Sequence, residues 1–264
     1  MQRYDIGRVF GRAFAVIRSG MGSVGLFLLA IAALTQGVQQ AMWWLMGQEI
    51  ERARLADHPD LIGTGLIDTP LYWLSILAAT VLATVGTAGS LAGYARLAGG
   101  KPAGIDACIN QGIARFLPVF ALTLLWWLGV VFGFLVFIVP GVILIVIWSA
   151  ALPALVVERN GVFEAFGRSR TLTRGWRGIV FVTLLVLALL LYVPPAIFGA
   201  SVLGGLDQIA LNPGFGNNIA LIVGSTLYGW YSAMVLNAVL VAIHQELVEV
   251  NEGGSTGELS EVFG

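Results

Sequence analysis

Few side chains of this protein could carry out acid–base, nucleophilic or metal chemistry. His58 lies in a polar stretch beside Asp57 and Asp60, and Cys108 is the single cysteine, so no disulfide can form within the chain. One imidazole with two nearby carboxylates could bind a metal weakly, but the same residues are ordinary solvated loop sequence. No HExxH motif is present, and the single GxSxG spacing, at residues 253–257, lies in linker-like sequence. We therefore predict no catalytic residue, no metal site and no cofactor.

The second histidine, His244, is followed directly by Gln245 and Glu246. An imidazole next to a carboxylate inside a membrane would be a candidate proton relay. His244, however, comes at the end of a long apolar run, where the chain returns to polar sequence. We interpret it as a residue of the membrane–cytoplasm interface rather than as a relay.

The arginines are the charged residues with a clear pattern. Twelve of the 14 basic residues lie in three segments, 3–18, 94–115 and 158–177, and the other two are Arg52 and Arg54. Each arginine near an anionic membrane surface contributes about 1 kcal/mol to binding. We predict that the first and third segments contact anionic lipid headgroups or an acidic partner protein, although membrane topology alone would also place arginines there. The candidate residues are Arg8, Arg12, Arg168, Arg170, Arg174 and Arg177.

The composition indicates which elements must position these arginines. Hydrophobic residues make up 58% of the 264 residues and charged residues 11%, against about 45–50% and about 25% in soluble domains. This excludes a soluble enzyme and a disordered chain, and a net charge of −1 excludes a nucleic-acid-binding protein. A bilayer core needs about 20 apolar helical residues per span. The long stretches without Asp, Glu, Lys or Arg are 21–48, 69–95, 116–157, 178–206 and 208–245.

The stretch 116–157 is long enough for two spans. Val139-Pro140-Gly141 favours a break within it, because proline lacks the amide hydrogen and glycine tolerates positive φ. A re-entrant hairpin is the alternative for this stretch. The first run is too long for a cleaved signal peptide, so we interpret it as a retained span. The sequence thus predicts an all-α polytopic membrane protein with six transmembrane helices, at about 21–46, 70–93, 116–138, 141–157, 178–199 and 218–243.

The distribution of basic residues predicts the orientation of these spans. Because twelve lie on one side and two on the other, we expect both termini in the bacterial cytoplasm and the spans in the inner membrane. We expect residues 1–245 to form a single six-helix domain. Residues 246–264 contain five acidic residues and no basic one, and 253–257 has the composition of a linker, so we expect an acidic flexible cytoplasmic tail.

Each basic segment precedes a span in a similar way. In 6–17 and 105–116 apolar residues recur at the spacing of one helix face, whereas 162–173 begins with this pattern and fails at Ser169, Arg170 and Thr173. We predict amphipathic cytoplasmic helices that lie along the inner leaflet, in three repeated units of one interfacial helix and one transmembrane hairpin. The alternative is that these helices are extensions of the spans.

The third segment and the start of the chain also resemble a known group of proteins. The residues that carry the resemblance are Glu158, Gly161, Glu164-Ala165, Arg168-Ser169, Leu172-Thr173-Arg174-Gly175-Trp176 and the opening Ile6–Phe14. They are similar to a family of mostly uncharacterised bacterial six-helix membrane proteins, which includes the membrane domain fused to some glycerophosphodiester phosphodiesterases. The resemblance implies the fold and the inner membrane. It implies no activity, because the phosphodiesterase chemistry belongs to a separate domain absent from this sequence.

Uncharged polar residues within the spans are candidates for contacts between helices. Gln36 and Gln40 share one face of the first span, and Asn237 lies in the last. A buried amide can form interhelical hydrogen bonds worth about 0.6–2 kcal/mol, so we predict that these side chains point inward. The lining of a polar cleft is the alternative. Gly89-x3-Gly93 and Gly129-x3-Gly133 predict close approach between helices.

These features predict a non-enzymatic inner-membrane protein that acts through its basic cytoplasmic helices on anionic lipid or on a partner protein. One alternative is a transporter or channel for a small neutral or lipid-like solute. The other is an accessory subunit of a membrane complex. The spans contain no Asp, Glu, Lys or Arg at depth, which argues against proton-coupled transport.

Overall fold

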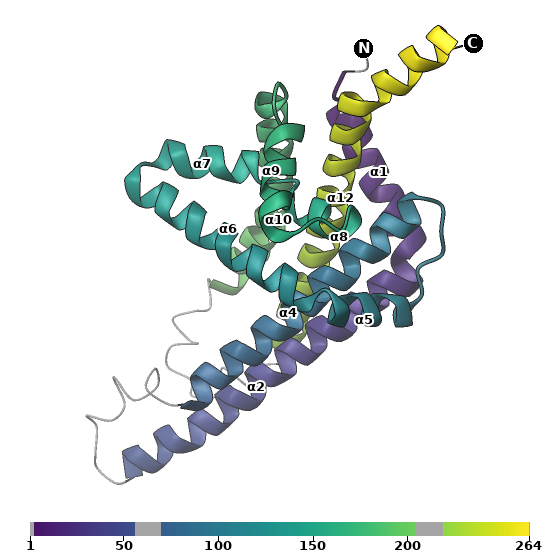
Figure 1. Ribbon diagram of the computed structural model, residues 1–264. Coiled ribbons are helices and arrows are strands. Elements are labelled where there is room, and N and C mark those ends of the chain that lie inside the picture. The colour runs from purple at the N-terminus through teal and green to yellow at the C-terminus, as the bar shows by residue number, and fades with distance from the viewer. Residues whose placement is uncertain (1–2, 56–69, 204–218, 264) are drawn as a thin grey trace.

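Long helices pack at several angles around one central helix (Figure 1). A computed structural model describes residues 3–55, 70–203 and 219–263, and this part of the chain contains helices and no strand. Six of its helices are long and apolar enough to cross a membrane, which confirms the predicted all-α polytopic fold. The candidate spans are Ile6–Met42, Pro70–Ala98, Phe116–Val136, Ile138–Val157, Arg177–Ala196 and Ile222–Gly253.

The helical elements differ from the spans because short helices connect or interrupt them. In chain order they are α1 (Ile6–Gly20), the π-helix η1 (Met21–Gly25), α2 (Leu26–Leu55), α4 (Pro70–Ala98), α5 (Ile105–Ala114), α6 (Phe116–Val136), α7 (Ile138–Ile147), α8 (Ala151–Val157), α9 (Val162–Leu172), α10 (Arg177–Leu203) and α12 (Ile219–Phe263).

The first amphipathic segment continues directly into the first span. α1 starts after Asp5, whose Oδ1 accepts a hydrogen bond from the Gly7 amide at 2.7 Å, and it runs through η1 into α2. Val9, Ala13 and Ile17, which we expected at the acyl boundary, are buried, and α1 packs against α12. For this segment the structure therefore favours the alternative, an extension of the span.

The second and third segments form the separate short helices α5 and α9. α5 lies along α4, where glycines let the two backbones approach closely. A Cβ atom on Gly89 would lie 2.4 Å from the Cys108 carbonyl oxygen, and one on Gly93 would lie 2.9 Å from Cys108 Sγ. The close approach expected from this glycine spacing is thus made, in part with a short helix rather than with another span.

The stretch 116–157 is divided at a different residue from the one predicted. α6 ends at Val136, and Phe137 adopts an extended backbone with φ −163° and ψ 158°. Pro140 lies in the first turn of α7, where the amide that proline lacks would have no intrahelical partner, so it starts a helix instead of ending one. The prediction of a break at Val139-Pro140-Gly141 is therefore wrong. A second interruption separates α7 from α8.

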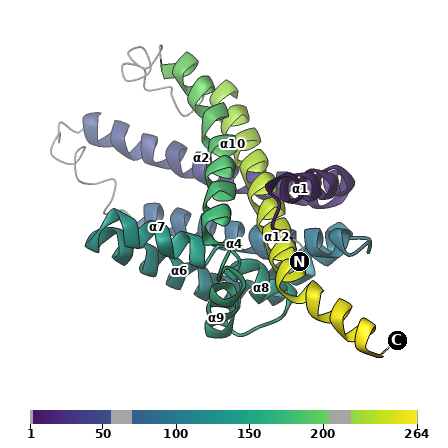
Figure 2. The same cartoon turned by 90° about the horizontal axis from the view of Figure 1, so that it is seen from above.

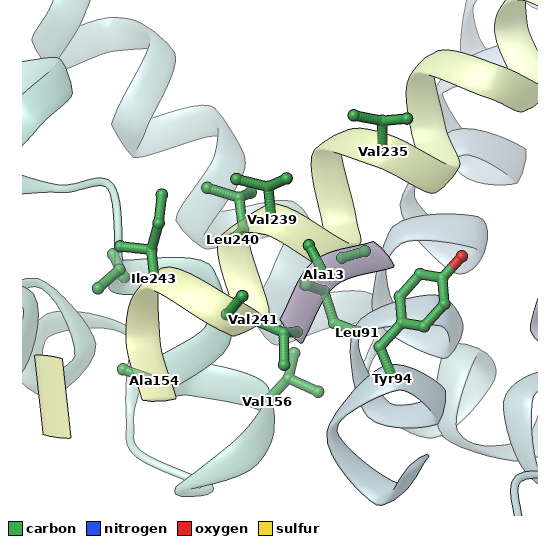
Figure 3. Packing of buried hydrophobic residues seen from close by; sticks show 14 of the residues in the cluster. Ala13, Leu91, Tyr94, Ala154, Val156, Val235, Val239, Leu240, Val241 and Ile243 are labelled. Atoms are coloured by element: carbon green, nitrogen blue, oxygen red, sulfur yellow. The ribbon is translucent and has the colours of Figure 1, made fainter. Parts of the chain in front are cut away.

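The hydrophobic core surrounds α12. This helix contacts α1, α2, α4, α8, α9 and α10, and both views show α1 beside it (Figures 1 and 2). Val239, Ile243 and Leu247 of α12 are almost completely buried, as are Leu91 of α4 and Ala154 of α8, which belong to the same cluster (Figure 3). The last span is therefore the one that the others enclose.

The acidic tail expected from residue 246 onward is instead a helix where it begins. α12 continues past Gln245 without interruption and ends at Phe263. Glu246 and Leu247 are fully buried, so these first residues of the expected tail belong to the packed part of α12. The physical reason is that three glutamates of this region, Glu246, Glu249 and Glu252, form ion pairs with arginines.

Candidate functional site

The predicted arginines of the first segment form ion pairs within the chain. Arg8 Nη2 lies 2.8 Å from Glu246 Oε1, and Arg12 Nη1 lies 3.3 Å from Glu246 Oε2. Arg12 Nη2 also lies 2.5 Å from Glu249 Oε2. The backbone amide of Asp5 donates a hydrogen bond to Glu246 Oε1 at 3.1 Å. These contacts compensate the buried carboxylate of Glu246 and join α1 to α12.

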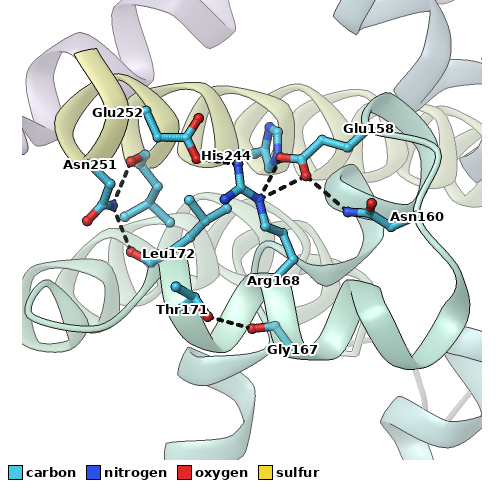
Figure 4. A network of polar contacts seen from close by, with 10 residues as sticks. Glu158, Asn160, Gly167, Arg168, Thr171, Leu172, His244, Asn251 and Glu252 are labelled. Atoms are coloured by element: carbon cyan, nitrogen blue, oxygen red, sulfur yellow. Dashed lines mark hydrogen bonds and ion pairs between the residues drawn. The ribbon is translucent and has the colours of Figure 1, made fainter. Parts of the chain in front are cut away.

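A second ion-pair network joins α8, α9 and α12, and Figure 4 shows its members converging. Arg168 Nε lies 2.8 Å from Glu158 Oε2, and Arg168 Nη2 lies 2.6 Å from Glu252 Oε1. His244 Nε2 lies 2.8 Å from Glu158 Oε1, and Asn160 Nδ2 donates to Glu158 Oε2 at 3.0 Å. Glu158 is thus the shared acceptor of the network.

The network keeps the Glu158 carboxyl ionised. Burial by itself would raise the pKa of this carboxyl, but hydrogen bonds from Arg168, His244 and Asn160 outweigh burial and lower the pKa below its ordinary value. Hydrogen bonding to Glu158 raises the pKa of the Arg168 guanidinium in turn. His244, which we expected at an interface, is buried with 4% of its surface exposed and is held by a carboxylate.

Ser169 forms hydrogen bonds with backbone groups at the interruption between α7 and α8. Its Oγ donates to the Ile147 carbonyl oxygen at 2.7 Å and accepts from the Ala150 amide at 3.1 Å. Backbone groups at a break in a span need such partners, because hydrocarbon offers none. The polar residues Ser169 and Thr173, at which the amphipathic pattern failed, lie on the buried side of α9. Ser169 is therefore a packing residue with a hydrogen-bonding role.

Of the remaining predicted arginines, Arg170 lies on the outward side of α9, Arg174 lies in the turn after α9, and Arg177 is the first residue of α10. Arg170, Arg174 and Arg177 are exposed, and none of them forms an ion pair with another residue that the structure describes. Phe163 and Arg170 are seven positions apart on α9 and so share its outer face, and the Phe163 side chain is 79% exposed. The six candidate arginines thus divide into three that pair within the chain and three that do not.

The polar residues predicted within the spans differ in whether they form the expected contact with another helix. Asn237 Nδ2 of α12 donates to Ser90 Oγ of α4 at 2.8 Å, and both side chains are buried, which is the interhelical contact expected for Asn237. Gln36 and Gln40 are half-buried and form no hydrogen bond with another described residue. The expected inward contacts of these two glutamines are therefore not seen in the described part of the chain.

A pocket of about 1000 Å³ opens between α1, α4, α8, α9 and α12. It borders both ion-pair networks, because Arg12, Glu249, Arg168 and Glu158 all line it, together with His244. Apolar residues of α1 and α4 form another part of its lining. The pocket therefore has one charged wall and one apolar wall.

No three His, Cys, Asp or Glu side chains among the described residues are placed to hold a metal ion together. The weak metal candidate His58, with Asp57 and Asp60, lies outside those residues. The Cys108 thiol is buried, and burial raises its pKa. Among the described residues the polar contacts of the site are ion pairs and hydrogen bonds.

Sequence reasoning missed the acidic half of the site. The missed residues are Glu158, Glu246, Glu249 and Glu252. A signal was available, since the last three are spaced at i, i+3 and i+6 and would share one side of a helix that continued beyond the span. Comparison of the chain with protein-family models, with curated proteins and with solved structures found no match.

Proposed function

We propose that this multi-pass membrane protein binds anionic phospholipid headgroups through the outer face of α9 and the start of α10. The binding residues are Arg170, Arg174 and Arg177, and the role is binding rather than catalysis. Both termini lie in the cytoplasm, and the membrane is a bacterial inner membrane, as the distribution of arginines and the family resemblance suggest.

The observation that supports this proposal is that some of the candidate arginines already have a carboxylate partner and others do not. Arg8, Arg12 and Arg168 already have carboxylate partners within the chain, so a headgroup would have to displace a bonded acid. Arg170 and Arg174 are exposed and have no acidic partner in the described part. An arginine without a partner gains most from a phosphate, because its planar group offers paired donors to two oxygens.

The position of these arginines relative to a span also supports the proposal. Arg177 is the first residue of the candidate span Arg177–Ala196, so its guanidinium lies where a helix leaves the hydrocarbon. Phe163, exposed on the outer face of α9, offers an apolar side chain to the acyl boundary beside the charges. A basic helix face with an exposed aromatic residue is typical of interfacial helices.

The test measures lipids that remain bound to the purified protein. The triple variant R170Q/R174Q/R177Q and the wild type are exchanged into nonionic detergent, and native mass spectrometry follows titration with phosphatidylglycerol or phosphatidylcholine. Each arginine contributes about 1 kcal/mol, so we expect the variant to lose at least about tenfold in affinity for phosphatidylglycerol and none for phosphatidylcholine.

The matched control removes three exposed basic residues elsewhere, in the variant R3Q/R18Q/K101Q. We expect this control to bind phosphatidylglycerol within about twofold of the wild type, a difference of about 0.4 kcal/mol. Equal losses in the two triple variants would show a response to net charge alone and would contradict the proposal. An unchanged affinity in R170Q/R174Q/R177Q, with loss of a co-purifying acidic protein, would point to a partner instead of lipid.

A further inference from the structure

The pocket between α1, α4, α8, α9 and α12 has the size and the mixed lining of a small-molecule site. Its volume of about 1000 Å³ lies at the upper end of the range of about 300–1,000 Å³ that ligand pockets occupy. Ala15 and Val16 of α1 and Leu97 of α4 give it an apolar wall. Such a wall would bury the apolar part of a ligand.

The charged wall of the pocket is negative on balance. Three carboxylates line it, those of Glu158, Glu249 and Glu252, against two guanidiniums, those of Arg12 and Arg168. The excess of negative charge favours a cationic ligand over an anionic one.

His244 adds a hydrogen-bond acceptor, its Nδ1 atom, to the charged wall. Its side chain is 95% buried and lines the pocket, and its Nε2 lies 2.8 Å from Glu158 Oε1. An ionised carboxylate only accepts hydrogen bonds, so a neutral imidazole must carry its proton on Nε2. Its Nδ1 is then an acceptor, and no described residue donates to it. An ammonium group supplies the missing donor.

We propose that this pocket binds an organic cation, a protonated amine attached to an apolar group. The ammonium lies against Glu249 and His244 of α12, and the apolar group lies against Ala15 and Val16 of α1. Among the described residues Glu249 is bonded to Arg12 through Oε2 alone, and its side chain is 38% exposed, so an ammonium can reach Glu249 Oε1 without displacing Arg12. This site is separate from the outward arginines of α9.

Three soluble probes that share a phenyl ring and a short spacer test the charge requirement. They are phenylethylamine, phenylethyl alcohol and phenylpropionate, titrated at neutral pH into the full chain in nonionic micelles and followed by isothermal calorimetry. Empty micelles give the partition background. We expect the amine to bind at least about tenfold more tightly than the alcohol, about 1.4 kcal/mol, and the anion to bind most weakly.

Two variants test the location of the bound amine. Glu249→Gln removes a carboxylate from the charged wall, and Ala15→Phe fills the apolar wall while it leaves every charge in place. We expect each to weaken amine binding by at least about tenfold. The control Asp106→Asn removes an exposed negative charge on α5, outside the pocket, and should leave binding unchanged.

Several outcomes would overturn the proposal. Equal affinities for the three probes would mean partition into an apolar surface. Wild-type affinity in Ala15→Phe, which keeps all the ion pairs, would place the bound amine elsewhere. If Asp106→Asn weakened amine binding as much as Glu249→Gln, the effect would depend on the net charge of the protein and not on the pocket.

Discussion

The candidate spans in α12 and α10 differ in burial, and the less apolar of the two is the more buried. The candidate span in α12 has a mean hydropathy of 1.5, and 67% of its most apolar stretch is buried in protein. The span in α10 has a mean hydropathy of 2.5, and 17% of the corresponding stretch is buried. The more apolar helix is thus the one that faces outward.

The comparison shows what a high apolar content means in this protein. A helix that faces lipid on most sides can carry only apolar side chains there, because an unpaired polar group in hydrocarbon is costly. A helix enclosed by other helices can carry Asn237, His244 and Glu246, because its neighbours supply their partners. Hydropathy therefore identifies the candidate spans, and among these six the span with the lowest mean hydropathy is the one most buried in protein.

The largest difference between the two helices is expected when the buried carboxylate of α12 loses its cations. The double variant Arg8→Ala/Arg12→Ala leaves Glu246, whose side chain is 1% exposed, without either guanidinium, which costs about 3–5 kcal/mol for an uncompensated buried charge. Arg177→Ala, at the exposed start of α10, should cost less than about 0.5 kcal/mol. Size-exclusion chromatography after graded heating in detergent measures both. Equal midpoints for the two variants would contradict the comparison.

A smaller difference is expected for an apolar truncation. Ile243→Ala in α12 removes a fully buried side chain and should cost about 2–5 kcal/mol. Leu189→Ala in α10 truncates a side chain that is 55% exposed and should cost less than about 1 kcal/mol in micelles. The same heating assay compares them. A larger loss for Leu189→Ala would show that α10 is covered by protein and not by lipid or detergent.

The smallest effect is expected from acidification of the network around Glu158. The pKa of this carboxyl is lowered in the folded protein, so its stabilising contribution is present above the ordinary glutamate pKa of about 4.3 and is lost as the pH falls through the lowered value. The stability difference between the wild type and Glu158→Gln should therefore shrink as the pH falls from about 6 to about 3. The heating assay repeated over this pH range measures that difference.

The control for the pH dependence comes from α10. The difference between the wild type and Leu189→Ala involves no titrating group, so it should stay constant over the same pH range. A constant difference for Glu158→Gln as well would mean that the bonds from Arg168 and His244 contribute nothing measurable to stability.

The sequence was sufficient to predict the spans because absence of charge is a local property. It was not sufficient to place the break near Pro140, because a proline favours both the end of one helix and the first turn of the next. The break falls one residue after α6, at Phe137, a residue without any turn preference. Packing between α6 and α7 decides between such neighbouring positions.

The basic half of the candidate site was predicted from the sequence, and the acidic half was not. Arginines are conspicuous in a chain with few charges, whereas Glu246 and Glu249 looked like the start of a solvated tail. Their partners, Arg8 and Arg12, lie at the other end of the sequence, and nothing local indicates such a pairing. The role of Ser169 could not be predicted for a related reason. The backbone groups that it bonds, the Ala150 amide and the Ile147 carbonyl, need a side-chain partner only because the chain is interrupted between α7 and α8.

The pairing of α1 with α12 also sets an order of events during synthesis. Arg12 and Glu249 are 237 positions apart, so at about 5–20 residues per second the arginine waits on the order of 10 to 50 s for its carboxylate. Throughout that interval Arg8 and Arg12 lack the carboxylates of Glu246 and Glu249, so these ion pairs cannot yet join α1 to α12. The ion pairs between α1 and α12 can therefore form only after α12 has been synthesised.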